Sequence, residues 1–221
     1  MSTKILKVIP LVTNFDEVKK SQLKVNVKEA RDQRFIRDKN TNKKLENFAE
    51  KFGFSIKSVI NNYEKNAKFR AGFIKDPSKQ GCAEKTALDL IKQWDGDIIN
   101  YYYPVPKNEQ IYVVNGEITT IRQNDLKNLD LQFFTESKHY NCSLKHIGEA
   151  GGAQDNQYND IRNFLRNCAK KNYGNEYFLA IVDGQYFENK VELLNAEFGS
   201  KNVKVLSVNK LYEYLVENES N

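Results

Sequence analysis

The stretch LDLQFFTESKHYN, residues 129–141, begins as a hydrophobic strand and ends with an acid and a lysine two positions apart. Because side chains alternate along a strand, Glu136 and Lys138 are expected to point to one side, with Ser137 on the other. A carboxylate close to an ammonium group can hold a hard divalent cation while the ammonium polarises a water or faces a phosphate. The stretch is therefore compatible with a metal-dependent site that hydrolyses phosphodiester bonds, and a plain charged pair on a solvated strand face is the alternative interpretation.

Such a site needs at least one more carboxylate on the cation, and three upstream acids are candidates. On one continuous strand, Asp130 would lie about 20 Å from Glu136, which is too far to share an ion. Asp125 can return to Glu136 if the chain turns at residues 127–130, so Asp125 is the preferred ligand and Asp130 the alternative. Glu117 is a third candidate if a longer hairpin brings it back. Ser137 is counted among the metal ligands together with Asp125 and Glu136.

Length and composition are those of a globular protein. The 221 residues can bury a full core, and a hydrophobic content of 40% argues against disorder. The formal net charge of +5 and the pI of about 8.9 permit a polyanionic partner. An N-terminus without a signal peptide and the lack of an 18-residue apolar run favour a cytosolic protein that does not contact a membrane. Three cysteines without C-x-x-C spacing indicate reduced thiols and no zinc site.

Hydrophobic periodicity around the opening stretch predicts a mixed α/β (α+β) fold. The expected elements after residue 75 are a helix at 76–94, a strand at 97–105, a hairpin at 111–121 that turns at Asn115-Gly116, the opening strand, a helix after the loop 147–159, a strand at 177–184, a helix at 190–199, a strand at 202–208 and a helix at 210–218. This order predicts a central mixed sheet flanked by helices over residues 76–221. Residues 1–75 predict a basic, mainly helical extension with a short strand at 4–12.

The extension contains a pattern that is typical of two helices joined by a tight turn. Within residues 45–64, Ala49, Gly53 and Val59 have the spacing of the small–glycine–apolar core of a helix-turn-helix. Such a unit would place the helix at 55–64 in a DNA groove. Its outward side chains would be Lys57, Ser58, Asn61 and Asn62. A plain helical hairpin is the alternative interpretation.

The order of these elements resembles the PD-(D/E)XK nuclease fold. A helix that bears a Glu comes first, an acid and an E-x-K motif follow on adjacent strands, and a helix and a buried strand come last. The segments ESKH (136–139), AGGAQDNQYNDI (150–161) and YFLAIVDG (177–184) resemble, in that order, type II restriction endonucleases of the EcoRI and MunI group. The resemblance implies that Glu136 and Asp125 bind Mg²⁺ and that Lys138 is the catalytic lysine. It also implies that Glu84, on the preceding helix, is an outer acid of the site.

The predicted base-reading residues differ from those of that group. Where the group carries Glu-Arg, this chain has Asp155-Asn156, flanked by Gln154 and Gln157. Asn and Gln can bond N6 and N7 of adenine, and Asp can accept from N4 of cytosine, so we expect at least one A·T pair in the recognised sequence. The other predicted DNA contacts are Arg162 and His139.

Together these features predict a Mg²⁺-dependent, sequence-specific endonuclease of double-stranded DNA, a type II enzyme of a restriction-modification system. A homodimer without an organic cofactor would read a palindromic site. A second hypothesis is a PD-(D/E)XK nuclease that acts on DNA structure or on any sequence, in repair or phage defence. A third is a helix-turn-helix regulator without catalytic activity.

Overall fold

The computed structural model describes residues 15–32, 39–73, 81–121, 126–147, 152–169 and 174–220. The chain divides into two compact units, one containing residues 14–83 and the other residues 84–221. The strand expected at 4–12 lies outside the described residues. Among the described helices, none has the length and apolar character needed to span a bilayer.

The first unit is helical. Its elements are α1 (Phe15–Asp32), α2 (Lys39–Phe52), α3 (Ile56–Lys65) and α4 (Ala67–Ala71). The turn between α2 and α3 lies at residues 53–55, and the Ser55 hydroxyl accepts the N–H of Ser58 at 3.2 Å, which caps the start of α3. The expected pair of helices with a tight turn is thus confirmed. Leu45, Ala49, Val59 and Tyr63 form the buried core of this unit.

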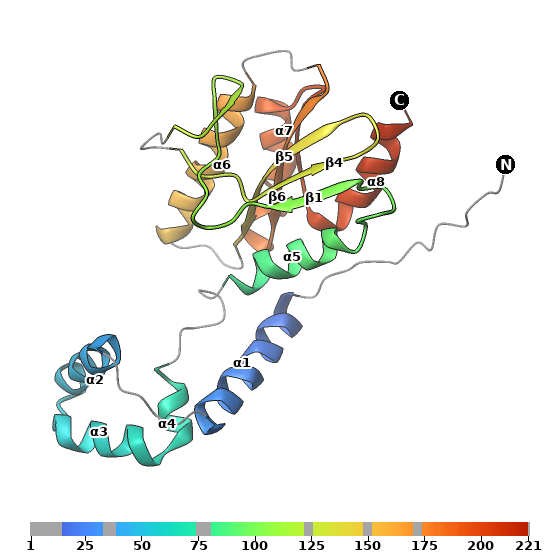
Figure 1. Ribbon diagram of the computed structural model, residues 1–221. Coiled ribbons are helices and arrows are strands. Elements are labelled where there is room, and N and C mark those ends of the chain that lie inside the picture. The colour runs from blue at the N-terminus through green and yellow to red at the C-terminus, as the bar shows by residue number, and fades with distance from the viewer. Residues whose placement is uncertain are drawn as a thin grey trace. The chain divides into compact units, whose positions relative to one another are not determined.

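The second unit is a five-stranded sheet with helices on both faces (Figure 1). Its strands are β1 (Tyr101–Pro104), β4 (Leu131–Phe134), β5 (His139–His146), β6 (Glu176–Asp183) and β7 (Val203–Leu206), in this spatial order. The pairs β1–β4 and β4–β5 are antiparallel, whereas β5–β6 and β6–β7 are parallel. The expected mixed sheet flanked by helices is therefore confirmed.

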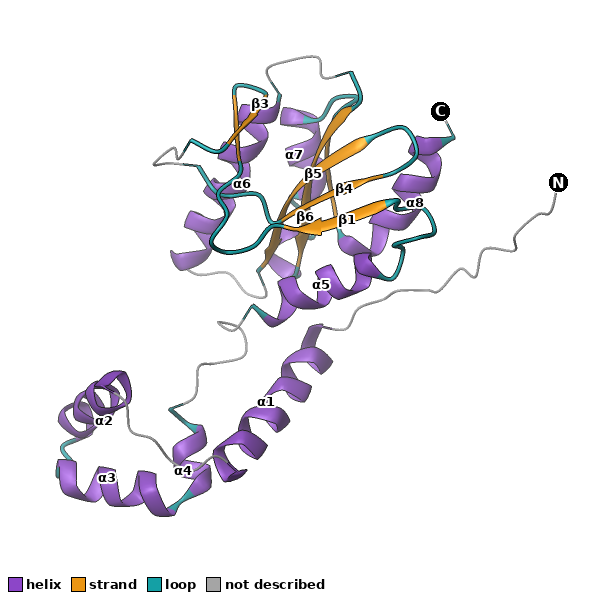
Figure 2. Ribbon diagram, in the orientation of Figure 1, coloured by secondary structure: helices purple, strands orange, loops and turns teal. Residues whose placement is uncertain are grey.

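Four longer helices accompany the sheet (Figure 2). They are α5 (Cys82–Lys92), α6 (Gly152–Cys168), α7 (Val191–Phe198) and α8 (Val208–Glu219). The apolar residues of α6 and α7 share one buried cluster with Phe178, Ala180 and Val182 of β6. The small hairpin of β2 (Tyr112–Val114) and β3 (Glu117–Thr119) turns at Asn115 (φ 49°) and Gly116 (φ 85°), which confirms the expected two-residue turn.

The opening stretch folds differently from the expectation. Strand β4 ends at Phe134 and β5 begins at His139, so residues 135–138 form the turn between two antiparallel strands. The N–H of Thr135 donates to the carbonyl of Lys138 at 3.0 Å and closes this turn. The placement of Glu136 and Lys138 on one face of a strand was therefore wrong, because the polar run that begins at Glu136 reverses the chain.

A buried acid joins the end of β6 to the start of α8. Asp183 is 9% exposed, and its Oδ2 accepts the N–H of Val208 at 3.2 Å. Burial raises the pKa of Asp183 to about 6 from its ordinary 3.8, although the hydrogen bond from Val208 acts in the opposite direction.

Replacing Asp183 by Asn is expected to stabilise the protein above pH 6 by up to about 3 kcal/mol. The native carboxyl keeps its proton up to about pH 6, whereas the unfolded chain loses it near 3.8, so wild-type stability falls as the pH rises between these values. The amide does not ionise and escapes this loss. Urea unfolding of both proteins above and below this pH window measures the effect. The gain should vanish at acid pH, and Glu136→Gln, at an exposed acid, should show no gain at either pH.

Candidate functional site

Polar side chains share one face of β4 and β5. In the register of the two strands, Gln132 is opposite Asn141 and Leu131 is opposite Cys142. Residues directly opposite each other have side chains on the same face, so Gln132 shares its face with Asn141, Ser143 and Lys145. The register of β5 on β6 aligns Ser143 with Ala180, which belongs to the apolar cluster under α6 and α7. The polar residues therefore lie on the face of the sheet that α6 covers.

Asp130 stands at the entrance of β4 and reaches this polar face. Its N–H donates to the carbonyl of Cys142 at 2.9 Å, so its main chain continues the pairing with β5. Its carboxylate Oδ2 accepts the N–H of Leu144 at 2.7 Å, the ammonium of Lys127 at 2.6 Å and the hydroxyl of Ser143 at 3.4 Å. Because a main-chain donor and an ammonium both hold it, this carboxylate has a defined position beside β5.

Lys145 is the basic residue of the same face. Its side chain is 14% exposed, and its Nζ lies 3.8 Å from Oδ2 of Asp160 on α6. Burial lowers the pKa of Lys145 below its ordinary value of 10.5, and the charge of Lys127 lowers it further; the carboxylates of Asp160, Asp130 and Glu84 act in the opposite direction. A partly buried lysine with a lowered pKa beside a carboxylate is typical of a reactive site.

The surroundings of Lys145 thus contain acids from three parts of the second unit. Asp130 comes from the entrance of β4, Asp160 from α6 and Glu84 from the first turn of α5. No group of three or more His, Cys, Asp or Glu among the described residues is close enough to hold a metal ion. The oxygen atoms that do meet beside β5 are those of the Asp130 carboxylate, the Leu144 carbonyl and the Ser143 hydroxyl.

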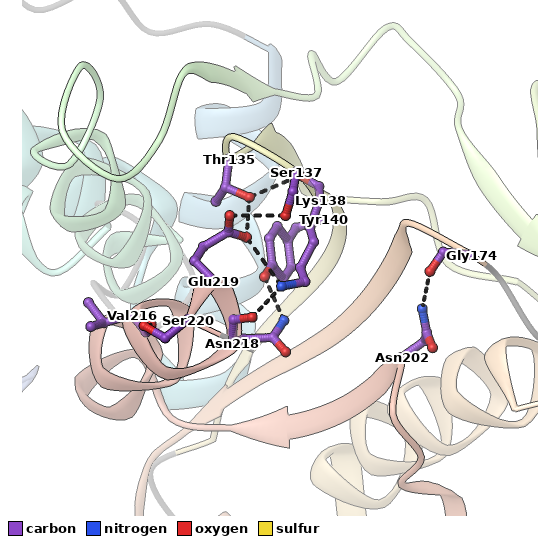
Figure 3. A network of polar contacts seen from close by, with 10 residues as sticks. All are labelled: Thr135, Ser137, Lys138, Tyr140, Gly174, Asn202, Val216, Asn218, Glu219 and Ser220. Carbon is purple, nitrogen blue, oxygen red and sulfur yellow. Dashed lines mark hydrogen bonds and ion pairs between the residues drawn. The ribbon is translucent and has the colours of Figure 1, made fainter.

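The residues of the E-x-K motif lie at the other end of β4, in the turn to β5. Glu136 is exposed. Lys138 is 12% exposed, donates to the main-chain carbonyl of Asn218 and lies 3.8 Å from Oε1 of Glu219 in α8. Figure 3 shows this network, in which Glu219 also accepts from Thr135 at 2.6 Å and from Ser137 at 3.2 Å. Lys138 and Ser137 therefore connect the turn to the last helix.

In the described part of the chain, none of the acids proposed to share a metal ion with Glu136 is placed beside it. Asp125 lies outside the described residues. Asp130 precedes β4, whereas Glu136 follows it, so the strand separates them. Glu117 is exposed on β3, in the separate two-stranded sheet. The metal-binding and catalytic roles of Glu136 and Lys138 stay predictions, and the contacts among polar groups converge instead on Asp130 and Lys145.

The predicted DNA-contacting residues lie on α6 and on β5. The side chain of Gln154 is outside the described residues, whereas Asn156 is exposed and Gln157 half-buried. Asp155 accepts the hydroxyl of Tyr186 at 3.0 Å. The remaining two residues are both paired: Arg162 donates to Glu197, and Nδ1 of His139 is 3.0 Å from Oε1 of Glu176. Their contacts with DNA stay predictions.

The sequence does carry a signal for the polar face of β5 on which Ser143 and Lys145 lie. Residues 140–145, YNCSLK, alternate buried apolar side chains with polar ones, which is the pattern of a strand with one polar face. A motif search for two acids and a lysine passes over this strand because Ser143 stands where an acid would be sought.

No protein-family model matches the chain, and the search of curated proteins found no match. The function of this mixed α/β protein is therefore inferred from its fold and from the residues that meet beside Asp130.

Proposed function

We propose that the chain is a Mg²⁺-dependent nuclease of the PD-(D/E)XK type that hydrolyses double-stranded DNA, with Asp130 and Lys145 in the place of the motif acid and lysine. One observation carries the proposal: Asp130, at the entrance of β4, and Lys145, on the adjacent strand β5, lie on the same face of the sheet and interact electrostatically. The Glu-bearing helix α5 precedes these strands, and helix α6 and buried strand β6 follow them. This is the order that the resemblance implies.

The oxygen atoms beside β5 are suited to a hard cation. Mg²⁺ prefers oxygen ligands and keeps several waters, so one carboxylate with a carbonyl and a hydroxyl can hold it. Asp130, the main-chain carbonyl of Leu144 and Ser143 supply these three oxygen types. When bound, the ion would stabilise negative charge on the phosphate and acidify a water.

Lys145 and the acids around it would act on the water and the phosphate. The partly buried ammonium of Lys145 can donate to the attacking water or to a phosphate oxygen, and its lowered pKa eases transfer of a proton. Asp130 would fix one oxygen position through its bonds to β5, which pre-organises the site. Asp160, 3.8 Å from the ammonium, and Glu84, whose charge acts on Lys145, are the acids that could hold a further water.

The helical unit supports DNA as the substrate. Residues 39–73 carry eight Lys and Arg against three Glu, a net charge of +5 that equals the formal net charge of the whole chain. On α3, Val59 is buried against α2, whereas Lys57, Ser58, Asn61 and Asn62 are exposed. A basic helix face with amide side chains suits phosphates and the adenine edge in the major groove.

Two features of the chain favour a second candidate function. Ser143 lacks the negative charge that the second motif acid supplies to a metal site, and the positive charge of the chain is concentrated in the helical unit. A DNA-binding protein whose sheet unit has no catalytic activity would carry both features. It predicts DNA binding that depends on Asn61 and no cleavage with any divalent ion.

The proposal is tested by incubating the purified chain with plasmid DNA and magnesium. Cleavage that needs the metal and stops on chelation is expected. Discrete fragments would indicate sequence-specific cutting, as in a restriction enzyme, whereas a smear would indicate a structure-specific or non-specific nuclease. Tight binding without cleavage by magnesium or manganese would contradict the proposal and leave the regulator.

A further inference from the structure

The ammonium of Lys127 occupies a position that has the surroundings of a cation site. Its Nζ is 2.6 Å from Oδ2 of Asp130 and 3.0 Å from the main-chain carbonyl oxygen of Leu144. The Ser143 hydroxyl approaches the same carboxylate oxygen, at 3.4 Å. The positive charge thus lies between a carboxylate and a main-chain carbonyl, which are ligand types that hard divalent cations take from proteins.

We propose that Lys127 is a built-in cation that fills the divalent-ion position between Asp130 and Leu144, and that it leaves this position when a phosphodiester takes up its charge. The first half of the proposal concerns metal binding by the protein alone. The second half rests on the proposed nuclease function, because it needs DNA at the same site.

Steric and electrostatic reasons make the ammonium and a metal ion exclude each other. Magnesium would have to approach the ligand oxygens to about 2.1 Å, and it cannot do so while Lys127 contacts both oxygens and carries the same sign of charge. A lysine ammonium sits on a flexible four-carbon stem, so it can turn to another anion without moving the backbone. A phosphate of bound DNA is such an anion.

The site does not need Lys127 to keep its shape. The N–H of Leu144 donates to Oδ2 of Asp130 at 2.7 Å, and the N–H of Asp130 donates to Cys142 at 2.9 Å. The carboxylate is therefore anchored to β5 by main-chain bonds that a substitution at Lys127 leaves in place. A neutral side chain at this position should uncover the oxygen ligands rather than scatter them.

The first test titrates the full chain with Mn²⁺ in the absence of DNA and reads free Mn²⁺ by electron paramagnetic resonance. Lys127→Met is expected to bind one Mn²⁺ at least about tenfold more tightly than the wild type, because the competing charge is gone. Lys127→Gln should show the same direction. Adding Asp130→Asn to Lys127→Met should abolish the gained site.

Lys210→Met is the matched control. Lys210 is exposed and pairs with Glu213 at 3.1 Å, so its replacement removes one charge and one ion pair far in sequence from the site. It should leave Mn²⁺ affinity unchanged. Equal affinities of the wild type, Lys127→Met and Lys127→Gln, with native circular dichroism, would overturn the proposal, and so would a gained site that survives Asp130→Asn.

The second test repeats the titration with a cleavage-resistant phosphorothioate duplex. DNA should tighten Mn²⁺ binding in the wild type, and by linkage Mn²⁺ should tighten DNA binding by the same factor. Lys127→Met should lose most of this coupling. Equal coupling in both proteins would refute the displacement step alone. If the chain does not cleave DNA, the proposed nuclease function is wrong. The Mn²⁺ titration without DNA would still test the role of Lys127.

Discussion

Replacing Lys145 by Met is expected to lower the rate of magnesium-dependent DNA cleavage by at least about 100-fold. The substitution removes the ammonium that lies 3.8 Å from Asp160 and keeps a side chain of similar length in the partly buried position. Asp130→Asn should cause a comparable loss, because it removes the charge that would attract the metal while keeping the bond from Leu144. Initial rates on supercoiled plasmid at fixed magnesium measure both.

Lys138→Met distinguishes the two assignments of the catalytic lysine. Lys138 is 12% exposed, like Lys145 at 14%, but its ammonium serves the end of α8. We expect this variant to be less stable to urea and to cleave at a rate within a few-fold of the wild type under native conditions. If Lys138→Met abolished cleavage and Lys145→Met did not, the E-x-K motif in the turn would be the site and the assignment to Asp130 and Lys145 would be wrong.

Gly184→Ala is expected to destabilise the protein by about 3 kcal/mol or more. Gly184 follows β6 with φ at +98°, a region that side chains rarely adopt. A Cβ at this position would lie 2.1 Å from the main-chain oxygen of Ile147, a residue whose N–H donates to the carbonyl of Asp183 at 2.9 Å at the end of the sheet. Because the obstacle is backbone, the clash can be relieved only by moving β5 or β6.

Gly174→Ala is the control at a glycine that has a positive φ and open space for a Cβ. Gly174 has φ at +56°, and a Cβ there would meet no atom within 4 Å. The Gly174→Ala substitution should lower the free energy of unfolding by only about 1 kcal/mol, which is the penalty for the left-handed conformation. Chemical unfolding of both variants gives the comparison. Equal losses would mean that the turn after β6 moves easily and that Ile147 does not constrain it.

Sequence predictions succeeded where a feature depends on residues that are close together in the chain. The turn at Asn115-Gly116 and the buried strand ending at Asp183 were predicted correctly, because each depends on neighbours along the chain. Turn chemistry and apolar runs are local properties, and they hold regardless of what packs on them.

The site was harder to predict because it depends on register. Asp130 contacts Ser143 only because β4 pairs with β5 through a turn at residues 135–138. No pattern in the neighbouring sequence predicts the position of that turn. The contacts of Lys138 with α8 join residues about eighty positions apart, so the partners of its ammonium could not be predicted from the sequence around it. Lys127 was overlooked because no sequence motif marks an ammonium that contacts a carboxylate and a main-chain carbonyl.

The network between the β4–β5 turn and the end of α8 also bears on how the chain folds. Thr135 and Glu219 are 84 positions apart, so their bond can form only after β6, α7 and β7 have been made and α8 has docked. Loop closure over such a span is slow compared with forming a hairpin. During synthesis the hairpin of β4 and β5 should therefore exist first as an open, readily exchanging element, and its amides should gain protection from hydrogen exchange only in the final folding step.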